Sequence, residues 1–210
     1  MRHPNFNEEK KLWRKGYKIV VGLDEAGRGP LAGPVVAAAV TVRKFSITNS
    51  QYPKVNDSKK LTPKKREKLY KLLKNCPFIE WGIGRVSERV IDRINIKNAA
   101  ELAMEKALKN LEKKLGKRAD FLIIDGNQLK NYKLKTKNYK LIIKADEKIF
   151  SVAAASILAK VTRDRIMARY HRKYPRYGFA QHKGYPTKMH RQKIKKYGFC
   201  KIHRKSFKIS

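Results

Sequence analysis

Acidic residues follow three apolar runs in this sequence. Asp24 and Glu25 come directly after KIVVGL. Asp125 follows FLII, and Asp146 follows KLIIKA. Apolar runs of this length are typical of buried strands, and strand ends meet at one rim of a sheet, so we expect the four carboxylates to converge. Clustered carboxylates repel one another, and a hard divalent cation such as Mg²⁺ or Mn²⁺ prefers oxygen ligands of this kind. The pattern therefore predicts metal-assisted cleavage of a phosphodiester.

Each of these acids taken alone is explained as well by a helix cap or by an ion pair with a basic neighbour. Three separate strand-end positions together favour a metal centre. Acidic residues are scarce in this chain, so their placement at strand ends is informative.

The charge of the chain limits its partners. Its 210 residues include 52 Lys and Arg against 17 Asp and Glu, which gives a formal net charge of +35. This charge predicts polyanionic partners, nucleic acid first and an anionic membrane second. No apolar run approaches about 18 residues, so we expect no membrane-spanning helix. Residues 1–15 lack the apolar core of a secretory signal, and Cys76 and Cys200 are typical of reduced thiols, so we expect a cytoplasmic protein.

Basic residues are concentrated towards the end of the chain. Residues 163–210 contain sixteen Lys or Arg and one acid, Asp164, with Tyr and Phe residues placed among them. Much of such a surface is simply solvated. Cations mixed with rings that can stack on bases are also what a nucleic-acid groove requires, so we expect nucleic-acid contact here.

The elements that must position these residues alternate between strand and helix. We expect strands over residues 17–23, 35–42, 78–86, 121–124 and 139–143, the third weakened by Gly82 and Gly84. We expect a helix from Thr62-Pro63 onwards and a helical region that starts at Ser87 and includes a clear amphipathic helix over 97–115. Two further helices are expected over residues 149–170 and 187–197. The alternation predicts an α/β fold, with an N-terminal extension over residues 1–16 and one domain over 17–210 that ends in a basic helical region, about 163–210.

The link between the first two expected strands, DEAGRGPLAGP at 24–34, resembles the signature of the ribonuclease HII family. The resemblance covers roughly residues 17–207 and is nearest to the bacterial branch. It continues in DSKKL (57–61), IIDG (123–126), KAD (144–146), AAASILAKVTRD (153–164), HKGYPTKMH (182–190) and HRKSF (203–207). One departure is Ala145, where the family usually has Gly before its last acid.

This resemblance implies a ribonuclease H-like α/β fold, with a central mixed β-sheet flanked by helices and a helical C-terminal extension. It implies a monomer that hydrolyses the RNA strand of RNA–DNA hybrids and incises duplex DNA 5′ to embedded ribonucleotides, leaving 3′-hydroxyl and 5′-phosphate ends. Two Mn²⁺ or Mg²⁺ ions would be held by the residues that match the family's four acids: Asp24, Glu25, Asp125 and Asp146.

The resemblance also implies which residues read the substrate. The family's Gly-Arg-Gly element falls on Gly27, Arg28 and Gly29, and its junction-sensing tyrosine falls on Tyr185. Glycines allow the backbone to approach a sugar closely, and the 2′-hydroxyl is the group that distinguishes RNA from DNA. Without the resemblance, Tyr185 would be interpreted as a half-buried packing ring. Further phosphate contacts are expected at Lys60, Lys160 and Arg163.

Three histidines near the end of the chain need a separate interpretation. His182, His190 and His203 have neither the paired cysteines nor the spacing of a zinc finger. We expect His182 to lie near the site or the substrate, and His190 and His203 to be structural.

Two other classes of protein remain open. A non-catalytic basic nucleic-acid-binding protein would explain the charge but not the strand-end acids. Another ribonuclease H-like metal nuclease, of the resolvase or integrase type, would share the acids but would not need the Gly-Arg-Gly element or Tyr185.

Overall fold

The computed structural model describes residues 3–43, 52–55, 58, 61–127, 129 and 138–209. Five strands form one sheet in the order β3-β2-β1-β4-β5. They are β1 (Val20–Ala26), β2 (Val35–Val42), β3 (Ile79–Val86), β4 (Phe121–Asp125) and β5 (Tyr139–Ile142). β2 is antiparallel to both β1 and β3, whereas β4 is parallel to both β1 and β5. The expected mixed sheet is confirmed.

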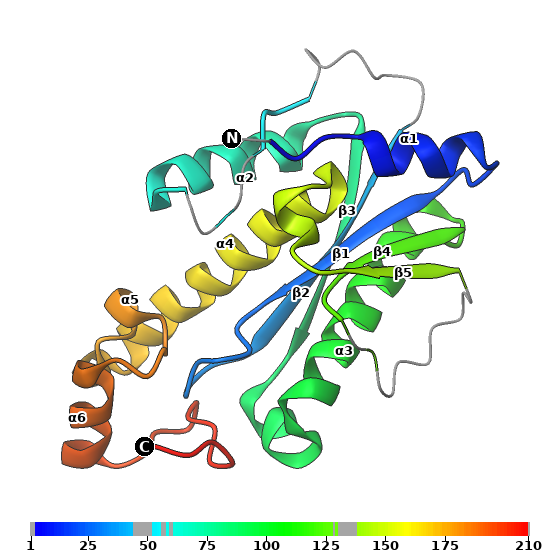
Figure 1. The fold of residues 1–210 in the computed structure, drawn as a ribbon. Coiled ribbons are helices and arrows are strands. Elements are labelled where there is room, and N and C mark those ends of the chain that lie inside the picture. Colours follow the sequence, from blue (N-terminus) through cyan, green and yellow to red (C-terminus); the bar gives the residue numbers. More distant parts are fainter. Residues whose placement is uncertain are drawn as a thin grey trace.

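Helices cover both faces of this sheet (Figure 1). The long helix α3 lies on one face and α4 on the other, and the short C-terminal elements lie beyond the far end of α4. The α-helices are α1 (Asn7–Arg14), α2 (Pro63–Asn75), α3 (Glu88–Leu115), α4 (Phe150–Lys173), α5 (Phe179–His182) and α6 (Lys188–Tyr197). Two 3₁₀ turns are η2 (Ala145–Glu147) and η3 (Pro175–Tyr177). No described helix is both long enough and apolar enough to cross a membrane.

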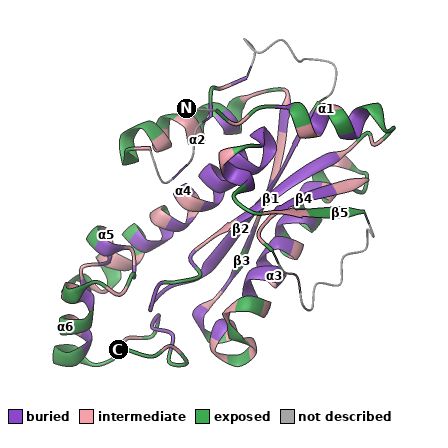
Figure 2. Cartoon of the chain, in the orientation of Figure 1, coloured by how far each residue is buried: buried purple, intermediate pink, exposed green. Residues whose placement is uncertain are grey.

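The centre of the sheet is buried on both faces because Val20–Leu23 of β1 and Val35–Val40 of β2 carry no polar side chain. In β2, Val35, Ala37 and Ala39 pack into the core on the α3 side. The alternate residues Ala38 and Val40 pack into the core on the α4 side. Side chains along a strand alternate between faces, so a run without polar residues suits a strand covered twice. Figure 2 shows β1 and β2 in purple along most of their length, whereas the edge strand β5 is intermediate or exposed.

Glycines let the helices approach the sheet closely. A Cβ atom at Gly82 would overlap the carbonyl oxygen of Ala107, and one at Gly84 would overlap that of Ala103. Both carbonyls belong to α3. The two glycines that were expected to weaken β3 therefore allow α3 to pack directly on its backbone.

The N-terminal segment packs on the rest of the molecule. Phe6 stacks on Phe150 at the start of α4, with ring centroids 4.3 Å apart. Leu12 and Trp13 of α1 are buried in the same core cluster. The carboxylate of Glu9 accepts a hydrogen bond from the backbone N–H of Ser151 at 2.9 Å.

Several element boundaries differ from the sequence expectation. β1 begins at Val20 and continues through Ala26, so Asp24 lies within the strand and not after it. The helical region expected to start at Ser87 is confirmed, because α3 begins at Glu88 with Ser87 as its N-cap, but Asn95 (φ 63°, ψ 167°) interrupts its helical backbone before the span 97–115. α5 and the 3₁₀ turns were not expected. The N-cap at Thr62 and the left-handed C-cap at Gly116 are confirmed.

The close packing of β3 against α3 is testable. We expect Gly84→Ala to lower the free energy of unfolding by about 1–3 kcal/mol, because the added methyl group meets helix backbone that has no room to move. Denaturant unfolding would measure the change. Arg85→Ala, at an exposed position of the same strand, is the control and should change it by no more than about 0.5 kcal/mol. A Gly84→Ala protein as stable as the parent would contradict this account of the interface.

Candidate active site

Asp24 is a buried carboxylate near the end of β1. Its position in β1 directs the side chain to the α4 face, and its Oδ1 accepts the backbone N–H of Glu25 at 2.7 Å. Burial raises the pKa of Asp24 well above its usual range, and the negative charges of Glu25, Asp125 and Asp146 raise it further. A hydrogen bond from the Ser156 hydroxyl of α4 opposes this shift. The site therefore favours a positive charge next to Asp24.

Glu25 follows Asp24 in the strand, so its side chain points to the other face of the sheet. There it forms an ion pair with Arg28, with Nη1 and Oε1 3.2 Å apart. Burial raises the pKa of Glu25, and the Arg28 guanidinium partly offsets that increase. The two adjacent acids therefore approach the end of the sheet from opposite faces.

Asp125 is brought beside Asp24 by strand register. β1 and β4 are parallel and pair Leu23 with Ile124, so the next residues along the two strands are neighbours. Oδ1 of Asp125 accepts the backbone N–H of Ala145 at 2.7 Å, which ties the end of β4 to η2.

Asp146 is buried within η2. The chain turns from β5 into η2 at Lys144, whose φ of 55° lies in the left-handed region. Ala145 is not among the residues with positive φ, and it is fully buried. The departure from glycine at this position therefore requires no unusual backbone conformation.

The four acids suit a divalent metal of the Mg²⁺ or Mn²⁺ type. They supply only oxygen donors, and the buried charge of Asp24 is opposed by three other carboxylates. Within the described ranges, no three His, Cys, Asp or Glu side chains already form a closed metal-binding group. The acids thus form an electrostatic cluster that a cation would draw together and neutralise.

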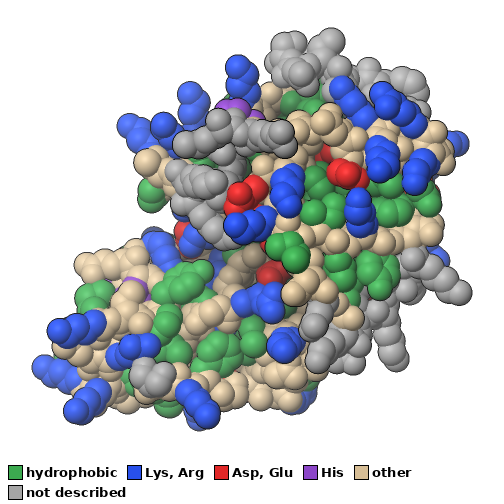
Figure 3. Space-filling model, in the orientation of Figure 1, with side chains coloured by type: hydrophobic (Ala, Val, Ile, Leu, Met, Phe, Trp, Pro, Cys, Tyr) green, Lys and Arg blue, Asp and Glu red, His purple; other side chains and the backbone are tan. Residues whose placement is uncertain are grey.

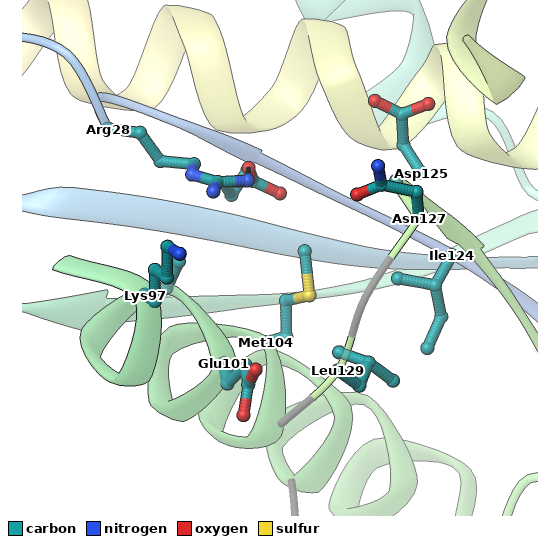
Figure 4. A pocket seen from close by; sticks show the side chains of 11 residues that line it. Arg28, Lys97, Glu101, Met104, Ile124, Asp125, Asn127 and Leu129 are labelled. Atoms are coloured by element: carbon teal, nitrogen blue, oxygen red, sulfur yellow. Dashed lines mark hydrogen bonds and ion pairs between the residues drawn. The ribbon is translucent and has the colours of Figure 1, made fainter. Parts of the chain in front are cut away.

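A cleft of about 260 Å³ opens beside Glu25 and Asp125, between the ends of β1 and β4 and helix α3. Figure 4 shows Lys97, Glu101 and Met104 reaching into it from α3, while the Asp125 carboxylate points towards α4. On the surface drawn in Figure 3, acidic side chains are few and lie between many Lys and Arg side chains. An anionic substrate would therefore meet a cationic surface with a small acidic centre.

The Gly-Arg-Gly loop is held from behind by a buried arginine. Arg204 donates from Nη2 to the carbonyl of Gly27 at 2.6 Å and from Nη1 to that of Arg28 at 3.0 Å. Its Nε donates to the carbonyl of Gly33 at 2.9 Å. Burial, together with the nearby charge of Arg163, lowers the pKa of Arg204 to about 9. The loop carbonyls are thereby fixed towards the interior.

Arg163 is a second buried arginine on the same loop, and the expectation that it contacts a phosphate is wrong. Its guanidinium is fully buried and donates to the carbonyls of Pro34, Ala32 and Lys183, each at 3.0 Å. A Cβ atom at Gly27 (φ 102°) would overlap this guanidinium. Gly27 is therefore required by its backbone angle and by the arginine packed against it.

Tyr185 lies over the outer side of the loop. Its ring is 41% exposed, and its Cε1 would be 3.9 Å from a Cβ atom at Gly29. The Nζ atom of Lys160 lies 5.8 Å from the centroid of the ring and also pairs with Asp164 at 2.8 Å. Lys60 lies outside the described residues. Of the expected substrate residues, Gly27, Arg28, Gly29, Tyr185 and Lys160 are thus gathered around one loop.

Sequence reasoning missed two contributors to this site. Ser156, which hydrogen-bonds Asp24, lies in an alanine-rich helix that predicts packing only. Arg204 is one of many cations near the end of the chain, and only its complete burial distinguishes it. No local pattern marks either residue.

The strand order β3-β2-β1-β4-β5, with acids at the adjacent ends of β1 and β4, defines a nuclease with the ribonuclease H-like fold. The crystal structure of ribonuclease H2 from Pyrococcus horikoshii OT3 matches with a TM-score of 0.73 and 29% identity, covering 91% of this chain and 94% of that one. A family model described as Ribonuclease HII matches residues 21–210, and the chain belongs to the ribonuclease HII family.

Curated relatives agree with this membership. The ribonuclease HII of Acetivibrio thermocellus is 50% identical over 199 residues, which cover 95% of this chain and 73% of that protein. The ribonuclease HII of Caldicellulosiruptor bescii is 48% identical over 203 residues, which cover 96% of this chain and 92% of that protein. The protein is therefore a metal-dependent ribonuclease H that acts on RNA–DNA hybrids, and the non-catalytic and resolvase-type alternatives are set aside.

The electrostatic account of Asp24 predicts how metal and pH affect stability. Because its pKa is raised in the fold, Asp24 stabilises the metal-free protein below its ordinary pKa of 3.8 and loses that contribution as the pH rises through the raised value. Asp24→Asn should therefore raise the metal-free unfolding temperature at pH 7, by about 2–4 °C for each kcal/mol of repulsion removed.

The same variant should lose most of the thermal stabilisation that Mn²⁺ gives the parent protein. Thermal unfolding with and without Mn²⁺ measures both effects. Asp92→Asn, which removes a carboxylate on α3, is the control and should keep the Mn²⁺ effect. An Asp24→Asn protein that responds to Mn²⁺ as the parent does would contradict the metal-site assignment.

Proposed function

We propose that this ribonuclease, besides acting on RNA–DNA hybrids, incises duplex DNA on the 5′ side of embedded ribonucleotides and leaves 3′-hydroxyl and 5′-phosphate ends. The observation that carries this proposal is that the exposed Tyr185 ring lies beside Gly29, with Cε1 3.9 Å from where a Cβ atom of that residue would be. The Tyr185 ring offers an aromatic surface for stacking, and the Gly27–Gly29 loop offers backbone that a sugar can approach. Both lie near the cluster of acids.

Asp24, Glu25, Asp125 and Asp146 are proposed to hold two Mn²⁺ or Mg²⁺ ions. When bound, such ions activate a water molecule for in-line attack at phosphorus and stabilise the leaving 3′-oxygen. Asp24 and Asp125 are neighbours by register, which supports a shared ion between them. The side chain of Glu25 lies on the other face of the sheet, so Glu25 would bind a metal ion from that side or through its backbone carbonyl.

Recognition of the 2′-hydroxyl is assigned to the Gly27–Gly29 backbone. The carbonyls of Gly27 and Arg28 are bound to Arg204, so the loop conformation is set before substrate arrives. Tyr185 stacks on the sugar of the next nucleotide, where a 2′-hydroxyl would interfere. This arrangement would recognise the junction at which a ribonucleotide is followed by a deoxyribonucleotide. Lys160, and Lys60 outside the described residues, are proposed phosphate contacts.

The wider organisation belongs to the same proposal. Residues 17–210 form one catalytic domain that ends in the basic region 163–210, and residues 1–16 form an extension packed on it, as the Phe6–Phe150 contact supports. The same proposal takes the protein to be a monomer that needs no membrane. The free thiols of Cys76 and Cys200 suit action in the cytoplasm.

Asp125→Asn tests the catalytic assignment. The amide oxygen can still accept the N–H of Ala145, so the fold is kept, while the lost negative charge removes a metal ligand. We expect cleavage of a labelled duplex containing one ribonucleotide to fall by at least about 100-fold in Mn²⁺ or Mg²⁺. Asp120→Asn, just before β4 at its other end, is the control and should cleave normally. Unchanged cleavage by Asp125→Asn would refute the assignment.

Tyr185→Ala tests substrate reading. We expect single-ribonucleotide incision to fall by about tenfold or more, the loss of one stacking contact, with little change in thermal stability because the ring is exposed. Tyr197→Ala, at a comparably exposed tyrosine (38%) on α6, is the matched control. Equal activity of Tyr185→Ala and the parent on single-ribonucleotide and hybrid substrates would remove the assignment.

A further inference from the structure

The backbone that leads into Tyr185 is strained. Lys183 has a φ of 51° and Gly184 a φ of 86°, so two successive residues are left-handed. A non-glycine residue in this region costs free energy unless its surroundings hold it there. A Cβ atom at Gly184 would lie 2.6 Å from the carbonyl oxygen of Ala32, so this segment is also pressed against the substrate loop.

Hydrogen bonds from two directions hold the strained residues. Arg163 donates to the carbonyl of Lys183, and the backbone N–H of Leu31 donates to that of Gly184 at 2.8 Å. Nδ1 of His182 accepts the N–H of Gly184 at 3.1 Å. Since that nitrogen is an acceptor, the neutral ring carries its proton on Nε2, which donates to the carbonyl of Tyr177 at 2.7 Å.

A second set of hydrogen bonds runs from Cys200 to Tyr185 through two buried histidines. The backbone N–H of Cys200 donates to Nδ1 of His203 at 2.9 Å, so the proton of His203 is on Nε2. That N–H faces Nε2 of His190 at 3.1 Å, which must accept it. The proton of His190 is then on Nδ1, which donates to the carbonyl of Tyr185 at 3.0 Å. Only this order of protons satisfies all three bonds.

The surroundings keep both rings neutral. Burial lowers the pKa of His190 to about 4, with the charges of His182 and His203 acting in the same direction. Burial likewise lowers the pKa of His203 to about 4, again with His182. The groups facing the pair are the His182 ring, stacked on His190 at 4.2 Å, the Cys200 thiol, 3.1 Å from Nδ1 of His203, and Tyr177. A further proton on Nε2 of His190 would point at the Nε2–H group of His203, so that two donors would face each other.

We propose that His190 and His203 are positioning residues for Tyr185, and that their proton-ordered chain fixes the main chain at Tyr185 and so holds its ring against Gly29. The proposal rests on the proposed function insofar as Tyr185 touches the substrate. It gives the two histidines a part in substrate selection. A purely structural role would make them interchangeable with any residue that fills the space.

Two substitutions at one position separate these roles. The side-chain amide of His190→Asn lies near the place of Nδ1 and can still donate to Tyr185. The amide of His190→Gln lies near the place of Nε2, so it keeps the contact with His203 and loses that with Tyr185. Both variants lose the same ring stacking on His182.

The measurement is the rate of single-ribonucleotide incision divided by the rate of long-hybrid cleavage. We expect His190→Gln to lower this ratio by about tenfold, as for loss of one buried hydrogen bond, and His190→Asn to keep it within about threefold of the parent. Equal ratios for the two variants would overturn the proposal. If His190→Gln does not fold, His203→Asn replaces it, because it keeps the Cys200 contact and removes the donor to His190.

Nuclear magnetic resonance gives a readout that does not depend on cleavage. The parent should show His190 as the Nδ1–H tautomer and His203 as the Nε2–H tautomer at pH 7, and His190→Gln, but not His190→Asn, should shift the Tyr185 carbonyl resonance. The reverse tautomers, or equal shifts in both variants, would overturn the proposal. Failure of the parent to nick a ribonucleotide-containing duplex would instead refute the proposed function, while these resonances still decide the positioning role.

Discussion

Two buried arginines hold residues 27–34 against α4 and the C-terminal segment. Arg163 from α4 and Arg204 from the C-terminal segment each donate three hydrogen bonds to backbone carbonyls, five of them within residues 27–34. A buried guanidinium without such acceptors would be very costly, so the loop and the arginines require each other. Gly27 is part of the same constraint, because a larger residue would displace Arg163. The loop, α4 and the last residues of the chain therefore form one unit.

Strand geometry distributes the acids around this unit. Asp24 and Asp125 share the α4 face through parallel register, whereas Glu25, one residue later in β1, belongs to the α3 face. Asp146 comes from a separate turn that a hydrogen bond from Ala145 fastens to Asp125. Like charges are thus gathered by backbone pairing and helix packing, whose free energy outweighs the repulsion between them. The acids are therefore held near one another by the fold itself.

Much of the fold and the acidic cluster could be predicted from the sequence, because both depend on local pattern. The apolar runs ending at Asp24 and Asp125 specify strands whose ends meet, and Thr62 and Gly116 specify helix termini. The rest depends on contacts between distant residues. Arg163 has the composition of a phosphate ligand but is buried by its neighbours, and the kink at Asn95 follows no local pattern. The role of Arg204 depends on a loop more than 170 residues earlier. The four acids match the family's metal-site residues and their partial convergence is seen here, yet their role as metal ligands stays a prediction.

The long sequence separation between Arg204 and its loop has a consequence for synthesis. A nascent chain that has reached Asp146 already carries all four acids and all five strands. Its Gly27–Gly29 loop, however, has no partner for its carbonyls until residue 204 has been added. The sheet and its acids are thus translated before the residue that fixes this loop. The conformation of the loop carbonyls is among the last features of the fold that this chain can complete as it is made.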